Sequence, residues 1–509
     1  MDKIYIDGHS LTLEQVAMVA REERPVALDQ AAVERINRSR DIVEQYVDRE
    51  EVVYGVTTGF GRFSDVAISR DETETLQRNL IVSHACGVGD SFTRDVTRAV
   101  MLLRVNTLCR GYSGVRLETL RLLVEMLNSG VHPSIPQKGS LGASGDLAPL
   151  AHMVLVMLGE GRAEYKGEIM SGAEALKRAG LKPCTLSSKE GLALINGTQA
   201  MSAVASLTLV DALMLVKMAD ITAALTLEAL GGIEDAFDKR IHEVRGHSGQ
   251  ILSAKNIKDL IEESSYTTRQ GEKRVQDAYA LRCTSQVHGA CRDAVEYAAR
   301  VVGTEINAVT DNPLIFPDSG DVLSGGNFHG EPVALAMDFL GIALSELANI
   351  SERRIERLVN PQLSNDLPAF LTRKGGLNSG FMITQYAAAA LVSENKVLAH
   401  PASVDSIPSS ANQEDHVSMG TIAARKASEI KDNLASVLAI EYLASAQAID
   451  LQGTGKLGRG TGPVYKMLRA RIKPLEEDRI MHVDMQSALE LIMSGKPVRS
   501  AEKMLMREL

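Results

Sequence analysis

Prolines are absent from two long tracts of this sequence, residues 26–132 and 184–312. Proline breaks a helix because it lacks a backbone donor and clashes with the preceding turn, so these tracts allow long helices to run without interruption. Within the second tract, residues 200–230 are almost all helix formers, and apolar residues cover more than one face. This pattern predicts a helix that is buried among other helices.

A second apolar pattern lies at Met337, Leu340, Leu344 and Leu347. The 3, 4, 3 spacing places these side chains in one seam along one side of a helix. The chain has no tryptophan, and aromatic residues make up only 4% of it, so its core must be aliphatic. Long stretches rich in Ala, Leu, Glu and Lys favour helices over sheets. We therefore predict a mainly α fold, a long bundle of parallel and antiparallel helices.

The N-terminal region has a different character. Residues 3–6 form a short strand candidate that ends at Asp7-Gly8, and Thr12-x-x-Gln15 has the pattern of a capping box that opens a helix. We expect a smaller, mixed N-terminal head with active-site loops over residues 1–110. A central and C-terminal helical bundle should then follow over residues 111–509.

Charge and cysteine usage narrow the class of protein. The net charge of −10 and the lack of a Lys/Arg cluster argue against a nucleic-acid partner. The N-terminus lacks the features of a signal peptide, and the apolar runs near residues 147–158, 203–219 and 333–350 are short or broken by charges, so no membrane span is expected. The five cysteines are scattered and form no CxxC pair. We expect a cytoplasmic protein.

Two motifs match patterns of cofactor or metal binding, but the sequence around each of them argues against such a site. Gly453-Thr454-Gly455-Lys456-Leu457-Gly458 matches GxGxxG, but residues 434–451 before it form a predicted helix rather than a strand, so a loop between helices is expected. His84-Ala85-Cys86 offers two ligands with no second His/Cys cluster nearby in sequence, whereas a zinc site needs three or four. We expect neither a metal nor an external cofactor.

The segment from Gly139 to Pro149, GSLGASGDLAP, is unusually rich in small residues. Small residues let the backbone turn back on itself, and Asp146 followed by Pro149 is typical of a helix N-cap and first turn. The segment differs from the GxSxG nucleophile elbow, because Gly142-Ala143-Ser144-Gly145-Asp146 lacks the last glycine. Taken by itself, it predicts a glycine-rich turn that leads into a helix ending near Gly159.

Ala143-Ser144-Gly145 in this setting resembles the self-processing tripeptide of the aromatic amino acid ammonia-lyases. The resemblance covers essentially the whole chain, and Ser83-His84 with Glu414 points to the histidine-selective branch. The other matching segments are YGVTTGFG at 54–61, SHACGVG at 83–89, INGTQ at 195–199, VQDAYALRC at 275–283, GGNFHG at 325–330 and SANQEDH at 410–416.

The resemblance implies that the triad, carried by the helical bundle, forms the electrophile 4-methylidene-imidazol-5-one (MIO) autocatalytically. The residue types suit that chemistry, because Gly145 has an unhindered amide nitrogen, Ala143 crowds its carbonyl little, and Ser144 has a β-hydroxyl to eliminate. If Asp146 opens a helix, the positive end of the helix dipole would favour negative charge on the ring.

The resemblance also implies elimination of ammonia from L-histidine to give trans-urocanate, the first step of histidine degradation. Tyr54 is the candidate base and Tyr279 its assistant, with the two roles not distinguished. The implied substrate-binding residues are Arg282, Asn196 and Gln276 at the carboxylate, Phe328 over the prosthetic ring, and His84 and Glu414 at the imidazole.

A homotetramer with active sites shared between subunits is implied as well. Two alternatives with the same triad are a tyrosine ammonia-lyase and a tyrosine 2,3-aminomutase, since His84 could also bind a phenol. A carboxylate at position 414 would be left unpaired by a phenyl ring, so phenylalanine should be rejected. A helical scaffold that has lost processing is a further alternative, although every expected catalytic position is occupied.

Overall fold

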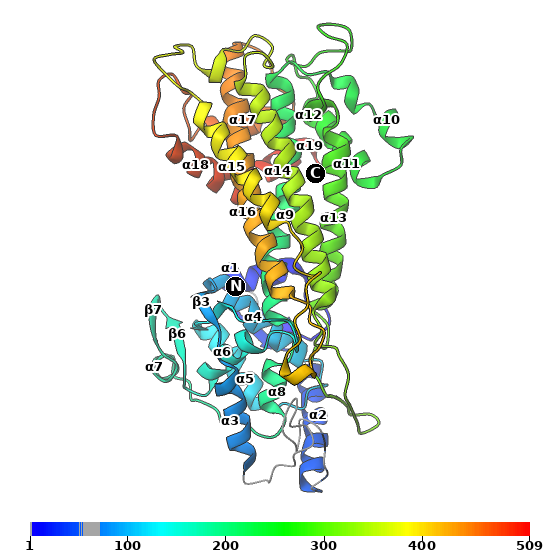
Figure 1. Ribbon diagram of the computed structural model, residues 1–509, viewed down its shortest axis with the longest axis vertical. Coiled ribbons are helices and arrows are strands. Elements are labelled where there is room, and N and C mark those ends of the chain that lie inside the picture. Colours follow the sequence, from blue (N-terminus) through cyan, green and yellow to red (C-terminus); the bar gives the residue numbers. More distant parts are fainter. Residues whose placement is uncertain (1–2, 50, 52, 54–71) are drawn as a thin grey trace. The chain divides into compact units, whose positions relative to one another are not determined.

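The computed structural model describes residues 3–49, 51, 53 and 72–509. Helices dominate this part of the chain, and its strands are short, so the prediction of a mainly α fold is confirmed (Figure 1). The chain forms two compact units. The first contains residues 1–210, 298–338 and 401–425, and the second contains residues 211–297, 339–400 and 426–509. The expected domain boundary at residue 110 stays a prediction.

The first unit combines helices with short strand pairs. Strands β1 and β2 pair in parallel, and β4, β6 and β7 form an antiparallel sheet, as do the pairs β3/β5 and β8/β9. Its elements are β1 (Ile4–Ile6), α1 (Leu13–Arg21), β2 (Val26–Leu28), α2 (Gln30–Asp48), α3 (Thr73–His84), β3 (Val88–Ser91), α4 (Arg94–Leu108), α5 (Leu117–Ser129), β4 (Val131–Pro133), β5 (Pro136–Lys138), α6 (Leu147–Met157), β6 (Arg162–Tyr165), β7 (Glu168–Ser171), α7 (Gly172–Arg178), α8 (Glu190–Ile195), β8 (Leu314–Phe316), β9 (Asp321–Leu323) and the 3-10 turn η5 (Ser410–Asn412).

The second unit is built around long helices. Four of them contribute residues to both units: α9 (Gln199–Ala229), α13 (Thr284–Glu305), α14 (Glu331–Val359) and α16 (Gly420–Gln452). The elements that lie wholly in the second unit are η3 (Glu234–Phe237), α10 (Lys239–Glu243), α11 (Ser248–Leu260), α12 (Tyr279–Arg282), η4 (Ala369–Leu371), α15 (Met382–Leu398), α17 (Thr461–Arg469), α18 (Met481–Met493) and α19 (Lys496–Leu505).

Buried charges cross-link the helices of the second unit. Glu441 of α16 accepts hydrogen bonds from Arg354 of α14 at 2.5 and 2.9 Å and from Thr226 of α9 at 2.9 Å. Asp220 of α9 accepts one from His288 of α13 at 2.8 Å. These bonds show that α9, α13, α14 and α16 run side by side within this unit, as Figure 1 also shows. The predicted bundle is therefore present.

Several local predictions are confirmed. Residues 4–6 form β1, and α1 begins with a capping box in which Gln15 N–H donates to Thr12 Oγ1 at 3.2 Å and Thr12 N–H donates to Gln15 Oε1 at 3.0 Å. The tract at 200–230 forms α9, which is buried on nearly every face along its length. The seam of Met337, Leu340, Leu344 and Leu347 is fully buried on α14.

The longest helices contain long apolar stretches. By length and composition alone, α9, α14 and α16 could cross a bilayer. The expectation that the runs near residues 203–219 and 333–350 are too short or too interrupted is therefore wrong, whereas the run near 147–158 forms the shorter helix α6, as expected. The most apolar windows of these helices are 83%, 67% and 83% buried inside the protein. Packing against other helices accounts for this apolar character.

The GxGxxG match is confirmed as the connection between α16 and α17. Gly458 N–H donates to Glu228 Oε1 at 2.7 Å, and Glu228 Oε2 has no partner among the described residues. Gly455 approaches Tyr266 so closely that a Cβ atom would lie 2.5 Å from the ring. Burial raises the pKa of Glu228 to about 7. Gly458 therefore lets this connection approach α9, and Gly455 lets it approach the ring of Tyr266.

Glu228 predicts a pH dependence of stability. A carboxyl with a folded-state pKa of about 7 and an unfolded value near ~4.3 binds its proton more tightly in the folded chain, so stability falls as pH rises from about 4.3 to 7. Glu228→Gln cannot ionise at this position. We therefore expect its free energy of unfolding, relative to that of the native chain, to rise by about 3 kcal/mol from pH 5 to pH 8. Thermal unfolding at both pH values measures this gain. An equal difference between the two chains at both pH values would contradict it.

Candidate active site

The Ala143-Ser144-Gly145 turn lies between β5 and α6 in the first unit. Ala143 is buried and packs with Val417 and Met419 in one apolar cluster. Met419 N–H donates to the Leu141 carbonyl at 3.2 Å, which ties the turn to the segment before α16. The turn is thus held from a part of the chain that lies far away in sequence.

Gly145 and Gly197 meet backbone to backbone. Gly145 has φ of +71°, and a Cβ atom added there would lie 2.2 Å from the Gly197 carbonyl oxygen. Asp146 N–H donates to this same oxygen at 2.7 Å. Within the described part of the chain, the Gly145 amide donates no hydrogen bond. Position 145 therefore requires glycine, and its nitrogen is available for chemistry.

The Asp146 side chain has a different role from the predicted one. Asp146 stands directly before α6, but its carboxylate makes no capping bond to that helix. It accepts a hydrogen bond from Met201 N–H at the start of α9 at 2.8 Å, one from Ser140 Oγ at 2.8 Å and one from Thr421 Oγ1. Asp146 is thus the residue before the first turn of α6, as predicted, but its side chain does not cap that helix, because it binds the free amides of the distant α9 instead. Burial raises the pKa of Asp146, and these bonds oppose the shift.

A pocket of about 230 Å³ opens beside the triad. Its wall combines the end of α3, the glycine-rich turn, the start of α6 and the residues on either side of η5. The lining residues are Ser83, His84, Cys86, Gly139, Ser140, Leu141, Ala143, Ser144, Gly145, Leu147, Ala148, Ser409 and Glu414. The structure thus brings His84, Glu414 and the triad together, although they come from three separate parts of the sequence.

Glu414 contacts the triad directly. Ser144 Oγ donates to Glu414 Oε1 at 2.8 Å, and Ser409 Oγ donates to Oε2 at 3.1 Å. The carboxylate therefore presents acceptor oxygens to the pocket and is half-buried there. Nothing in the local sequence around Ser409 indicated its position, because it meets Glu414 through a tight turn that only the structure reveals.

His84 is oriented by its neighbours on α3. Ser83 Oγ donates to the Leu80 carbonyl at 3.1 Å and lies 3.0 Å from His84 Nδ1. Since the single Ser83 hydroxyl proton is used, the hydrogen-bond pattern assigns the imidazole proton to Nδ1 and leaves Nε2 as an acceptor. Burial lowers the pKa of His84, while nearby Glu414 opposes the shift. The lowered pKa favours the neutral form of the His84 imidazole.

Asn196 and Phe328 belong to the same unit as the pocket. Asn196 is buried at the end of α8, where its Nδ2 donates to the Asn312 carbonyl at 3.0 Å, while Oδ1 has no partner among the described residues. Phe328 is half-buried in the loop before α14. The next residue, His329, lies against His416, with ring centroids 5.6 Å apart. The loops that carry Phe328 and Glu414 are therefore neighbours.

The remaining candidates fall elsewhere. Tyr279, Gln276 and Arg282 lie in the second unit, at or just before α12, and none of them lines the pocket. The Arg282 guanidinium stacks 4.5 Å from the centroid of the Tyr279 ring, and Arg282 Nε donates to the Asp277 carbonyl at 2.9 Å. Tyr279 is 69% exposed. Tyr54 lies outside the described residues.

Comparison with known proteins decides the family. The model of the family described as aromatic amino acid lyase matches residues 11–470. A histidine ammonia-lyase of Alkaliphilus oremlandii is 63% identical over 503 residues, which cover 99% of each chain. The chain belongs to the aromatic amino acid lyase family. Members of this family act on amino acids, so this lyase is an enzyme.

Solved structures agree with this assignment. Histidine ammonia-lyase from Trypanosoma cruzi is 42% identical to this lyase with a TM-score of 0.93, and the match covers 99% of this chain and 96% of the other. A tyrosine aminomutase from Streptomyces globisporus is 38% identical with a TM-score of 0.95 and 99% coverage of both chains. The fold is therefore common to an ammonia-lyase and an aminomutase, so the fold alone does not distinguish their reactions.

The close contact at Gly145 gives a direct test of the turn. In Gly145→Ala the new methyl group would collide with the Gly197 backbone, in addition to the strain of a positive φ. Gly180→Ala is the matched control, since Gly180 has φ of +74° with open space around it. We expect the control to lose about 1–2 kcal/mol of stability and Gly145→Ala to lose clearly more. Equal shifts in the melting temperature of the two variants would contradict the contact.

Proposed function

We propose that this lyase eliminates ammonia from L-histidine to form trans-urocanate, the first step of histidine degradation. One observation supports this most strongly: His84 and Glu414 face the same pocket as the triad in a chain that is 63% identical to a histidine ammonia-lyase. Tyrosine deamination or 2,3-amino migration is the competing reaction, since the tyrosine aminomutase has a similar fold. The higher identity to histidine ammonia-lyases favours histidine.

The triad fits the prosthetic group MIO. In the proposed cyclisation the Gly145 nitrogen attacks the Ala143 carbonyl carbon, and two waters leave, one of them with the Ser144 hydroxyl. The free Gly145 amide, the buried Ala143 and the half-buried Ser144, whose hydroxyl donates to Glu414 in the pocket, suit these steps. When formed, the group supplies an electrophile for the amine of the substrate. No external cofactor or metal is part of this proposal.

The pocket offers two hydrogen-bond acceptors to the substrate ring. His84 Nε2 and the Glu414 carboxylate can both accept a hydrogen bond from the substrate, and an imidazole ring provides N–H groups where a phenyl ring provides none. A buried acceptor left without a donor costs about 1–3 kcal/mol. The site therefore selects histidine over phenylalanine by leaving acceptors unpaired when the wrong ring binds.

The other end of the substrate is assigned to residues outside this pocket. Arg282 binds the carboxylate through its guanidinium fork, with Gln276 nearby, and either Tyr54 or Tyr279 removes the β-proton. Asn196, whose Nδ2 already donates to the Asn312 carbonyl, lies alongside Arg282 at the substrate carboxylate in this proposal. Phe328 packs over the prosthetic ring. These roles follow the family resemblance.

A homotetramer with shared active sites, in the cytoplasm, completes the proposal. Tyr279 is 69% exposed and Val275 is 71% exposed, although the resemblance gives this segment a catalytic role. On α14, Phe339 and Ile342 are each 46% exposed, and Phe339 stacks edge-on against Tyr297. Such apolar surface on a single chain is typical of an interface that another copy covers.

The proposed function is tested on the purified chain without added cofactor. We expect an intact mass two waters below that of the sequence and ammonia release from histidine but not from tyrosine. Ser144→Ala removes the hydroxyl that is eliminated, so both signals should be lost. Release of ammonia from tyrosine alone would contradict the choice of substrate, and full activity of Ser144→Ala would contradict the chemistry.

Recognition of the ring is tested by Glu414→Gln. The change removes the negative charge and one acceptor oxygen, so kcat/KM for histidine should fall about 10- to 100-fold. Asp415→Asn makes the same chemical change at the adjacent, exposed residue and should leave kcat/KM within about twofold. Equal effects of the two changes in a steady-state assay would exclude Glu414 from the ring pocket.

A further inference from the structure

Arg104 of α4 is a buried cation without a carboxylate partner among the described residues. Its side chain is completely buried. Nη1 donates to the Asn196 carbonyl at 3.0 Å and to Gln199 Oε1 at 2.6 Å, and Nη2 donates to the Ala193 carbonyl. Burial lowers its pKa to about 10, so it remains charged at neutral pH. A buried guanidinium is energetically costly, so its retention calls for an explanation.

The atoms that Arg104 holds lead directly to the triad. The Asn196 carbonyl and the Gly197 amide share one peptide plane, so the bond to Arg104 fixes the orientation of this plane. The next carbonyl, that of Gly197, accepts the Asp146 amide at 2.7 Å. Arg104 Nη1 also lies so near Gly197 that an added Cβ atom would be 2.5 Å from it. One peptide therefore separates Arg104 from the turn that contains Gly145.

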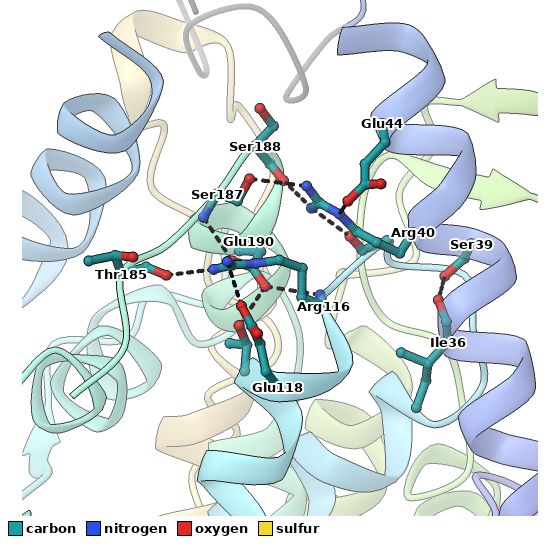
Figure 2. A network of polar contacts seen from close by, with 12 residues as sticks. Ile36, Ser39, Arg40, Glu44, Arg116, Glu118, Thr185, Ser187, Ser188 and Glu190 are labelled. Atoms are coloured by element: carbon teal, nitrogen blue, oxygen red, sulfur yellow. Dashed lines mark hydrogen bonds and ion pairs between the residues drawn. The ribbon is translucent and has the colours of Figure 1, made fainter. Parts of the chain in front are cut away.

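The opposite end of α8 is anchored by separate charges. The Glu190 carboxylate, which is fully buried, accepts hydrogen bonds from Arg116 at 2.6 and 3.0 Å and from Thr119 Oγ1 at 2.7 Å (Figure 2). Arg40 adds bonds to the Ser188 carbonyl and to Ser187 Oγ, each at 3.0 Å. All six residues of α8 are buried. The Glu190 end of α8 is therefore held by contacts that do not involve Arg104. The Arg104 guanidinium instead holds the Asn196–Gly197 end.

We propose that Arg104 is a positioning residue of the active site, which fixes the Asn196–Gly197 peptide and, through it, the Gly145–Asp146 turn. This inference rests on the proposed function. Gln199 extends the same arrangement, since its Nε2 donates to Thr310 Oγ1 at 2.8 Å while its Oε1 accepts from Arg104. The guanidinium fork is essential, because it reaches three oxygens in fixed directions, whereas an ammonium group is a single point charge.

The test compares two arginines of the same helix. Arg98 is also buried on α4, and it donates to the carbonyls of Val19 and Leu127 at 2.9 and 3.0 Å. Neither acceptor belongs to the triad turn or to α8. Arg104→Lys and Arg98→Lys therefore make the same change in similar surroundings, and both should lower the melting temperature. Only Arg104→Lys should change the chemistry.

Two measurements separate positioning from general stability. Intact mass gives the fraction of chains that have lost two waters, and ammonia release from saturating histidine gives kcat per matured chain. We expect Arg104→Lys to reduce the matured fraction or to lower kcat per matured chain at least tenfold. Arg98→Lys should keep both within about twofold of the native enzyme. The proposal is overturned if Arg104→Lys stays within twofold in both, or if Arg98→Lys falls equally.

A second variant covers the case in which Arg104→Lys does not fold. Gln199→Met keeps the length of the side chain but removes the bonds to Arg104 and Thr310, so kcat per matured chain should fall at least threefold. A value within the error of the native enzyme would overturn the proposal. Failure of the native enzyme itself to lose two waters, or to act on histidine, would instead contradict the proposed function.

Discussion

Asp146 N and the Gly197 carbonyl oxygen are 2.7 Å apart, and the two chain segments can approach this closely only because residue 145 lacks a side chain. A Cβ atom on Gly197 would meet Gln199, Arg104 and Thr310 at 2.4–2.7 Å. The site is built around this contact. It places the triad turn against the start of α9, and Asp146 bonds the first amides of that helix. The reactive turn is therefore fixed by backbone rather than by side-chain packing alone.

Charge placement follows from the same contact. Asp146 meets the amide end of α9, where a negative charge is favoured, and Arg104 meets the carbonyl end of α8, where a positive charge is favoured. Each is buried and opposite in sign to the helix end it meets, which offsets part of the cost of burial. In the pocket itself, His84 Nε2 and Glu414 offer acceptors that the N–H groups of an imidazole ring can satisfy and a phenyl ring cannot.

Local signals in the sequence predicted local structure well. The Thr12/Gln15 capping box, the β1 strand and the buried seam on α14 depend on neighbours within a few residues, and all three are confirmed. Asp146 shows where this approach fails, because its side chain binds Met201, 55 positions away, rather than its own helix. The sequence did not indicate the burial of Arg104 either, because a lone arginine in a helical pattern is usually exposed.

The functional residues were found through the family resemblance rather than through physical patterns. From its local sequence, Glu414 would be predicted to be a solvated loop residue. Only the structure shows that Glu414 Oε1 lies 2.8 Å from Ser144 Oγ. Gly197 stood inside a matching segment, INGTQ, so its importance could have been inferred there. Ser409 and Thr421 had no such signal, because Ser409 meets Glu414 through a turn of unusual backbone conformation and Thr421 meets Asp146, 275 positions away.

The central claim is that the Gly145–Gly197 contact sets the geometry in which the triad can cyclise. The intact mass of folded Gly197→Ala tests this most directly, since the new methyl group would collide with Arg104 and Gln199 and displace the carbonyl that holds Asp146. We predict that this variant, with a native-like circular dichroism spectrum, keeps the full mass of its sequence. Loss of two waters to the same extent as in the native chain would contradict the account.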